Sequence, residues 1–281
     1  MEWLTENKLP LGNWMKFAVD GLNDNAAWFF DAISLGLGTV IEGMVATLLW
    51  VPPLALIALF SIAGGRAQRS WSLGIGIALS LLLIINLGYW KETIETLTLV
   101  IFATTVCMSV GVPLGIMAAH RPWLESALRP VLDLMQTIPT FVYLIPTLIL
   151  FGLGVVPGLI STVIFALPAP VRLTTLGIKS TPKDLLEAGK AFGATRRQLL
   201  VKVELPSAMP TIMAGLTQCI MLSLSMVVIA ALVGADGLGK PVVRALNTVN
   251  IARGFEAGLA IVIVAILLDR VFRHTQRRGS R

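Results

Sequence analysis

Seven apolar stretches dominate the sequence, and most are close to the ~20 residues that a helix needs to cross a bilayer core. Their approximate limits are residues 44–63, 71–88, 96–119, 134–152, 156–171, 207–233 and 257–268. No Asp, Glu, Lys, Arg or His falls within these limits. With 56% hydrophobic and only 14% charged residues, the chain is predicted to be an all-α integral membrane protein with about seven transmembrane helices.

The distribution of basic residues predicts the orientation. With the N-terminus outside, 16 of the 22 Lys and Arg residues fall in the inside segments and six in the outside segments. Because cytoplasmic loops carry the excess of Lys and Arg, we expect an outward N-terminus and a cytoplasmic C-terminus. The net charge of +6 is therefore explained by topology and does not call for a nucleic-acid partner.

The stretch "GADGLGKPV" at 234–242 is one residue away from a nucleotide-binding phosphate loop. Gly234, Gly239 and Lys240 fill three fixed places of that pattern, but Pro241 stands where a Ser or Thr hydroxyl must bind magnesium. The stretch also follows a long apolar helix rather than a strand, so we do not expect ATP to bind here.

Catalytic and metal-binding patterns are missing from the sequence. There is no nucleophile elbow, HExxH or CxxC motif, and Cys107 and Cys219 lie far apart inside apolar stretches. His120 and His274 fall at cytoplasmic membrane edges, where we expect solvation rather than metal binding. We expect no catalytic residue, metal or cofactor on this chain. Since the spans also lack the ionisable groups of ion-driven transporters, uphill transport would need work from a partner.

The longest inside loop, residues 180–206, is predicted to form two short helices. Thr181 is a suitable N-cap, with Pro182 and Asp184 in the first turn, and Gly193 can end that helix in the left-handed conformation. Thr195 and Gln198 form a capping box for the second helix, which Leu205 and Pro206 are predicted to stop.

This loop resembles the EAA signature of the permeases of binding-protein-dependent ABC importers. Glu187, Ala188, Gly193, Leu205 and Pro206 match it, whereas Gly189 and Val203 replace the usual Ala and Ile. The resemblance implies a type I ABC importer permease fold and a loop that docks on a separate ATP-binding subunit, where ATP and magnesium would bind. The docking residues that it implies, with their neighbours, are Asp184, Leu185, Glu187, Ala188, Gly189, Ala191, Phe192, Gly193, Ala194, Arg196, Leu205 and Pro206. The alternative is an elbow whose basic residues only meet lipid phosphates.

The architecture further resembles the glycine betaine, proline betaine and choline branch of these permeases, and among them a choline permease most. The segments "LPLGNWMKFAVDGL", "QTIPTFVYLIP" and "ALPAPVRLTTLGIKSTPKDLLEAG" carry this resemblance. It implies a branch-specific extension at 1–90, a common core at 91–275 and a cytoplasmic basic tail at 276–281. It also implies that Gly234, Gly237 and Gly239 form an outer glycine turn, with a plain exterior loop as the alternative.

The extension carries apolar residues at helical spacing between Trp14 and Leu48, with Asp20, Asp24, Asp31 and Glu42 among them. We expect one amphipathic helix, or two broken near Asn23–Asn25, along the outer membrane interface. It would serve as a landing surface for a binding protein or as a lipid-anchored brace.

The translocation path is expected near "QTIPTFVYLIP", because Pro139 and Pro146 would kink or unwind this span and free backbone carbonyls. Gln136, Thr137, Thr140 and Tyr143 are the predicted pore-facing side chains. We expect a homodimer in the inner membrane, with an ATP-binding subunit and a substrate-binding protein as partners. A permease of another importer branch, for methionine or amino acids, and an ion-coupled secondary transporter remain the alternatives.

Overall fold

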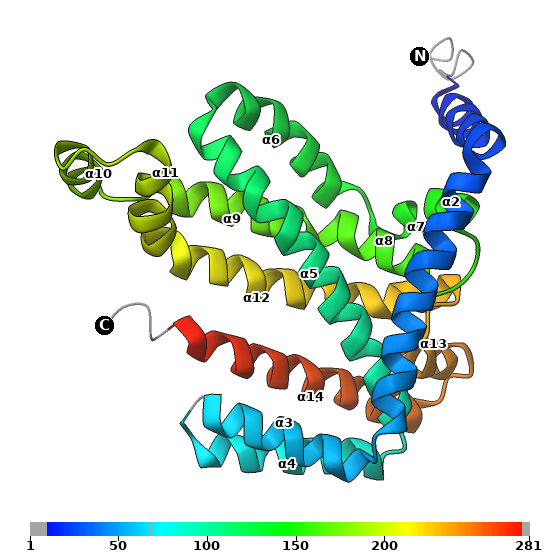
Figure 1. Ribbon diagram of the computed structural model, residues 1–281. Helices are drawn as coiled ribbons and strands as arrows, with labels where there is room; N and C mark the ends of the chain where they lie inside the picture. The colour runs from blue at the N-terminus through cyan, green and yellow to red at the C-terminus, as the bar shows by residue number, and fades with distance from the viewer. Residues whose placement is uncertain (1–9, 68, 277–281) are drawn as a thin grey trace, which may run out of the picture.

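The computed structural model describes residues 10–67 and 69–276, and every element in that part is helical. Figure 1 shows the helices gathered into one bundle. The α-helices are α2 (Leu11–Trp50), α3 (Pro53–Ala67), α4 (Trp71–Asn86), α5 (Trp90–His120), α6 (Pro122–Thr137), α7 (Thr140–Phe151), α8 (Val155–Ala166), α9 (Pro168–Lys179), α10 (Lys183–Ala191), α11 (Arg196–Leu199), α12 (Leu205–Ala230), α13 (Gly239–Asn247) and α14 (Ile251–Gln276). A π-turn, η1 (Leu200–Glu204), and a 3-10 turn, η2 (Ala231–Val233), flank α12.

The centre of the bundle is α12, which packs against α5, α8, α9 and α14. Small residues allow the closest of these approaches: a Cβ added to Gly177 would lie 3.1 Å from the Cβ of Ala208. A Cβ added to Gly115 of α5 would lie 2.7 Å from the carbonyl oxygen of Val171 in α9. Close backbone approach through small residues is the usual way in which membrane helices associate.

By length and composition, five helices of the described residues could cross a membrane, or six if the bent pair α6 and α7 is one span. The sequence predicts about seven spans, and the difference lies in the extension. Its predicted first span, 44–63, is divided between α2, which ends at Trp50, and α3, which begins at Pro53. The helix is interrupted at Pro52 and Pro53, because proline breaks helical hydrogen bonding, and the two short apolar helices that follow, α3 and α4, pack against each other.

The helix α2 is longer than predicted. It has a non-helical residue at Ala26, next to the expected break at Asn23–Asn25, yet it continues to Trp50 as a candidate span. Ile41 packs in a core cluster with Ala103 and Leu159, and Figure 1 shows α2 crossing α5 steeply. The position of α2 relative to a membrane interface stays a prediction.

Charged residues lie on the spanning helices, in contrast to the limits drawn from hydropathy. The candidate span Trp90–His120 includes Lys91 and Glu95, and Val155–Lys179 includes Arg172. Helical hydrogen bonding continues beyond the apolar run, so each helix extends into its polar ends. Arg172, however, lies seven residues before Lys179, the last residue of its span.

Candidate functional site

The first helix of the predicted coupling loop projects away from the bundle (Figure 1). None of the residues of α10 is buried, and the Phe192 side chain that follows it is 92% exposed. Most predicted docking residues are exposed, and only Gly189, Ala194 and Leu205 are half-buried. The exposed Phe192 and the exposed Leu185 give the loop two apolar side chains that a docking partner can cover.

The start of α10 differs from the prediction by one residue. Pro182, with φ −55° and ψ 131°, is the N-cap, whereas Thr181 is buried and caps nothing. The end agrees with the prediction, because Gly193 has φ +74°. The Gly193 N–H donates to the Lys190 carbonyl at 2.9 Å and the Ala194 N–H donates to the Gly189 carbonyl at 3.0 Å. These two bonds make a Schellman motif.

The second half of the loop contains one confirmed and one wrong prediction. Thr195 and Gln198 form the expected capping box, with the Gln198 N–H donating to the Thr195 hydroxyl at 3.3 Å. Leu205 and Pro206 do not stop the helix, since they are the first residues of α12. A π-turn at Leu200–Glu204 widens the helix just before Pro206, which leaves space for the proline ring.

One contact holds the two helices of the loop together, and another joins the loop to the bundle. A Cβ added to Gly189 would lie 2.7 Å from Leu199 Cδ2, so α10 rests on α11 through a glycine. His120, at the end of α5, has its Nε2 2.9 Å from the Glu204 carboxylate in η1. The His120 side chain is 46% exposed, in agreement with the expected solvation, and the Glu204 carboxylate is a partner that the sequence did not predict. The side chain of His274 lies outside the described residues.

The predicted outer glycine turn is packed against neighbouring helices. Gly234 and Gly237 have φ +88° and +121°, and Gly239 begins α13. The Leu238 N–H donates to the Thr96 hydroxyl of α5 at 2.8 Å, and a Cβ on Gly239 would lie 2.5 Å from the Val227 carbonyl oxygen. Gly237, Leu238 and Gly239 are buried, which contradicts the alternative of a plain exterior loop.

A polar cleft of about 340 Å³ lies beside this turn, between the starts of α5 and α14 and the helix α13. Tyr89, Glu92, Glu95, Asp236, Lys240 and Arg253 are among its lining residues. Burial, and next the Glu256 carboxylate, raise the pKa of Tyr89 above its ordinary value. Sequence reasoning missed this cleft, because its charges come from three separate segments.

The predicted path residues lie at a sharp break between two helices. Pro139 is the N-cap of α7, and α6 and α7 are bent by 95°. The Tyr143 hydroxyl donates to the Met135 carbonyl at 2.7 Å, so one freed carbonyl is occupied by a tyrosine. Thr137 also bonds back to its own helix, by donating to Leu134. Pro146 lies inside α7, which is helical from Thr140 to Phe151, so the helix is not unwound there.

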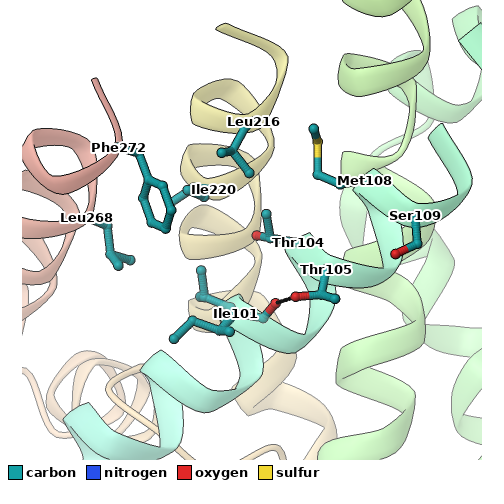
Figure 2. Close-up of a pocket in the computed structure, with 10 residues that line it drawn as sticks. Ile101, Thr104, Thr105, Met108, Ser109, Leu216, Ile220, Leu268 and Phe272 are labelled. Carbon is teal, nitrogen blue, oxygen red and sulfur yellow. Dashed lines mark hydrogen bonds between the residues drawn. The ribbon is translucent and has the colours of Figure 1, made fainter. Parts of the chain in front are cut away.

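None of the predicted path residues lines the cavity of Figure 2. This cavity of about 350 Å³ lies between α5, α12 and α14, and Thr104, Thr105, Met108 and Ser109 give it a neutral polar side. Thr105 donates to the Ile101 carbonyl at 2.7 Å.

Cys107 and Cys219 meet in the core, although they are distant in sequence. Both are fully buried and share a cluster with Ala166. Cys107 Sγ donates to the Val163 carbonyl at 3.6 Å. Within residues 10–67 and 69–276, no three His, Cys, Asp or Glu side chains are grouped as metal ligands.

The family model for "binding-protein-dependent transport system inner membrane component" matches residues 111–281. The glycine betaine transport system permease protein OpuAB of Bacillus subtilis is 46% identical over 268 residues, which cover 94% of this chain and 93% of that protein. The glycine betaine/proline betaine transport system permease protein ProW of Escherichia coli is 42% identical over 279 residues, which cover 97% of this chain and 78% of that protein. A solved chain of the MetNI methionine ABC transporter has a TM-score of 0.61 at 24% identity, and the match covers 66% of this chain and 94% of that chain.

Proposed function

The chain belongs to the family of binding-protein-dependent transport system inner membrane components, and from this premise we propose that it is the permease subunit of an ATP-driven importer. It passes a quaternary ammonium compatible solute from a substrate-binding protein to the cytoplasm. Four relatives at 42–46% identity are named for glycine betaine, one of them also for carnitine and two also for proline betaine. Glycine betaine is therefore the leading substrate of the class, ahead of choline.

The observation that carries this proposal is the projecting loop with the exposed Phe192. A polar loop gains nothing from exposing a phenylalanine and a leucine to water, whereas a docking surface buries both. We propose that the ATP-binding subunit covers α10 and that ATP and magnesium bind there, on the partner. This chain then contributes no catalytic residue.

Orientation and assembly follow from the same assignment. The end of the bundle that carries α10 and α11 faces the cytoplasm, and the end that carries α13 and the glycine turn faces outward, where the binding protein docks. The N-terminus is then outside and the C-terminus inside, in agreement with the distribution of Lys and Arg. Each chain has one coupling loop, and we propose a homodimer that presents two loops to two ATP-binding subunits.

The experiment that tests the proposal is purification of the tagged chain from its native membrane in mild detergent. An ATP-binding subunit is expected to co-purify in equal amount and to be lost in Gly193→Trp. The Gly193 backbone lies in the left-handed region, where an L side chain is strained, so the variant distorts the loop and not the spans. Uptake of labelled glycine betaine should require ATP. Uptake that persists without ATP but ceases with the ion gradient would instead identify a secondary transporter.

A further inference from the structure

The helix α9 exposes one narrow stripe. Arg172, Leu176 and Lys179 are exposed along it, while most of its other residues are buried against α5, α8 and α12. The apolar part of the span Val155–Lys179 is more buried than that of the other four candidate spans of the described chain. A stripe on such a central helix is an unusual place for an arginine.

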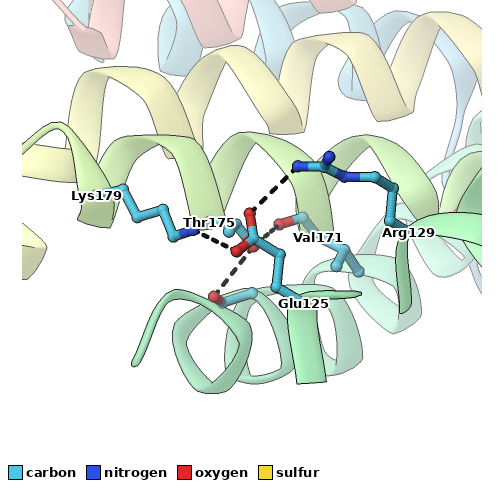
Figure 3. A network of polar contacts seen from close by, with 6 residues as sticks. Glu125, Arg129, Val171, Thr175 and Lys179 are labelled. Carbon is cyan, nitrogen blue, oxygen red and sulfur yellow. Dashed lines mark hydrogen bonds and ion pairs between the residues drawn. The ribbon is translucent and has the colours of Figure 1, made fainter. Parts of the chain in front are cut away.

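The stripe faces α6 through ion pairs. Figure 3 shows Glu125 of α6 between Lys179 of α9 and its own neighbour Arg129. Two helical turns further along both helices, Arg172 Nη2 lies 2.6 Å from Asp133 Oδ1. The Arg172 and Asp133 side chains are 41% and 55% exposed, so each charge keeps a free side.

The second ion pair lies away from the end of α9. Arg172 precedes the end of α9 at Lys179 by seven residues, which corresponds to about 10 Å along a helix axis. Charged side chains within a membrane span usually face a water-filled cavity or the interior of a bundle, and not hydrocarbon. Asp133 is also one turn before Gln136 and Thr137, at the broken end of α6. The pair therefore adjoins the predicted path.

We propose that Arg172 and Asp133 form a binding station for the zwitterionic substrate in the cytoplasmic half of the path, a proposal that rests on the proposed function. The Arg172 guanidinium takes the substrate carboxylate, and the Asp133 carboxylate lies against the quaternary ammonium. A betaine exchanges one ion pair for two and leaves no charge unpaired. A half-exposed ion pair is weak, so opening it costs little.

The station distinguishes betaines from choline by their charges. Choline carries the quaternary ammonium without a carboxylate, so it pairs with Asp133 and leaves Arg172 without a partner. The carboxylate of a betaine adds a charge-assisted contact with Arg172 that choline cannot make, so the station favours betaines over choline. Arg172 and Asp133 are thus specificity-determining residues.

Water access is tested first, with Leu176→Cys. Leu176 is exposed one turn after Arg172, and both native cysteines are fully buried and therefore silent. The full complex in inside-out vesicles is treated with a membrane-impermeant methanethiosulfonate that carries trimethylammonium. We expect modification at least about tenfold faster than in the control Leu79→Cys, an exposed residue of the apolar helix α4, because the thiolate that reacts requires water. Equal, slow rates would mean that the stripe faces lipid or a second copy and would overturn the proposal.

Substrate binding is tested next, by protection of Leu176→Cys. Glycine betaine should slow the modification, and adding Arg172→Gln should weaken this protection about tenfold, as expected for a lost charge-assisted hydrogen bond, while protection by choline persists. Adding Asp133→Asn should weaken protection by both compounds. No protection, or an equal loss for both compounds in Arg172→Gln, would leave only a structural ion pair. The exchange Arg172→Asp with Asp133→Arg should restore protection by glycine betaine, which shows that the single variants fail through charge and not through misfolding.

Cysteine labelling and its protection are measured without ATP hydrolysis or transport. If ATP-dependent uptake failed but labelling and protection held, the importer assignment would fall and the station would stand.

Discussion

Replacing Phe192 by Ala should detach the ATP-binding subunit without unfolding the permease. The side chain is 92% exposed, so nearly all of its apolar area is available for burial in a complex. Burying a phenylalanine stabilises by about 1.5–3 kcal/mol, and the dissociation constant of the ATP-binding subunit should therefore rise about ten- to hundredfold in Phe192→Ala. The thermal midpoint of the permease alone should not change, because the exposed ring contributes little to its packing.

The assay is a titration of the permease in nanodiscs with a fluorescent ATP-binding subunit. The matched control is Phe255→Ala at the start of α14, where another phenylalanine is 71% exposed at the opposite end of the bundle. This variant should bind the subunit normally. An unchanged affinity in Phe192→Ala, or an equal loss in both variants, would refute the assignment of α10 as the docking helix.

Three further substitutions test the packing that holds the site. Thr96→Val removes the acceptor of the buried Leu238 N–H and should destabilise the outer turn by about 1–3 kcal/mol, measured as a lower thermal midpoint. Gly115→Ala places a Cβ 2.7 Å from the Val171 carbonyl oxygen, so α5 and α9 must separate and stability should fall by about 1–3 kcal/mol in the same measurement. Thr195→Ala removes a capping box and should cost about 1 kcal/mol, seen as faster amide exchange in the coupling loop with the spans unchanged.

Local signals in the loop were predictable because they depend on few residues. The left-handed turn at Gly193 and the capping box at Thr195 each follow from side-chain chemistry within four residues. The continuation through Pro206 was not predictable in this way, since a preceding π-turn accommodates the proline and no local sequence rule signals it. The cap at Pro182 instead of Thr181 differs for another reason, because Thr181 is buried in the tertiary structure.

Contacts between segments that are far apart in the chain could not be predicted from the sequence. Hydropathy predicted the core spans, but it could not predict that Cys107 lies beside Cys219 or that Glu204 lies beside His120. It also ended one span at residue 171, because Arg172 reads as the start of a loop when only composition is considered. Packing reverses that interpretation, since α9 continues for two more turns inside the bundle.

The continuity of α9 joins the two proposed sites. The coupling loop is bracketed by α9 before it and by α12 after it, and these helices touch where Gly177 meets Ala208. A displacement of α10 by the ATP-binding subunit would therefore move both helices together, because contacts this close do not slide freely. Arg172 belongs to the same helix α9, whereas Asp133 belongs to α6. Movement of α9 relative to α6 would change the separation of the two charges, so a displacement of the docking loop would open or close the ion pair between Arg172 and Asp133.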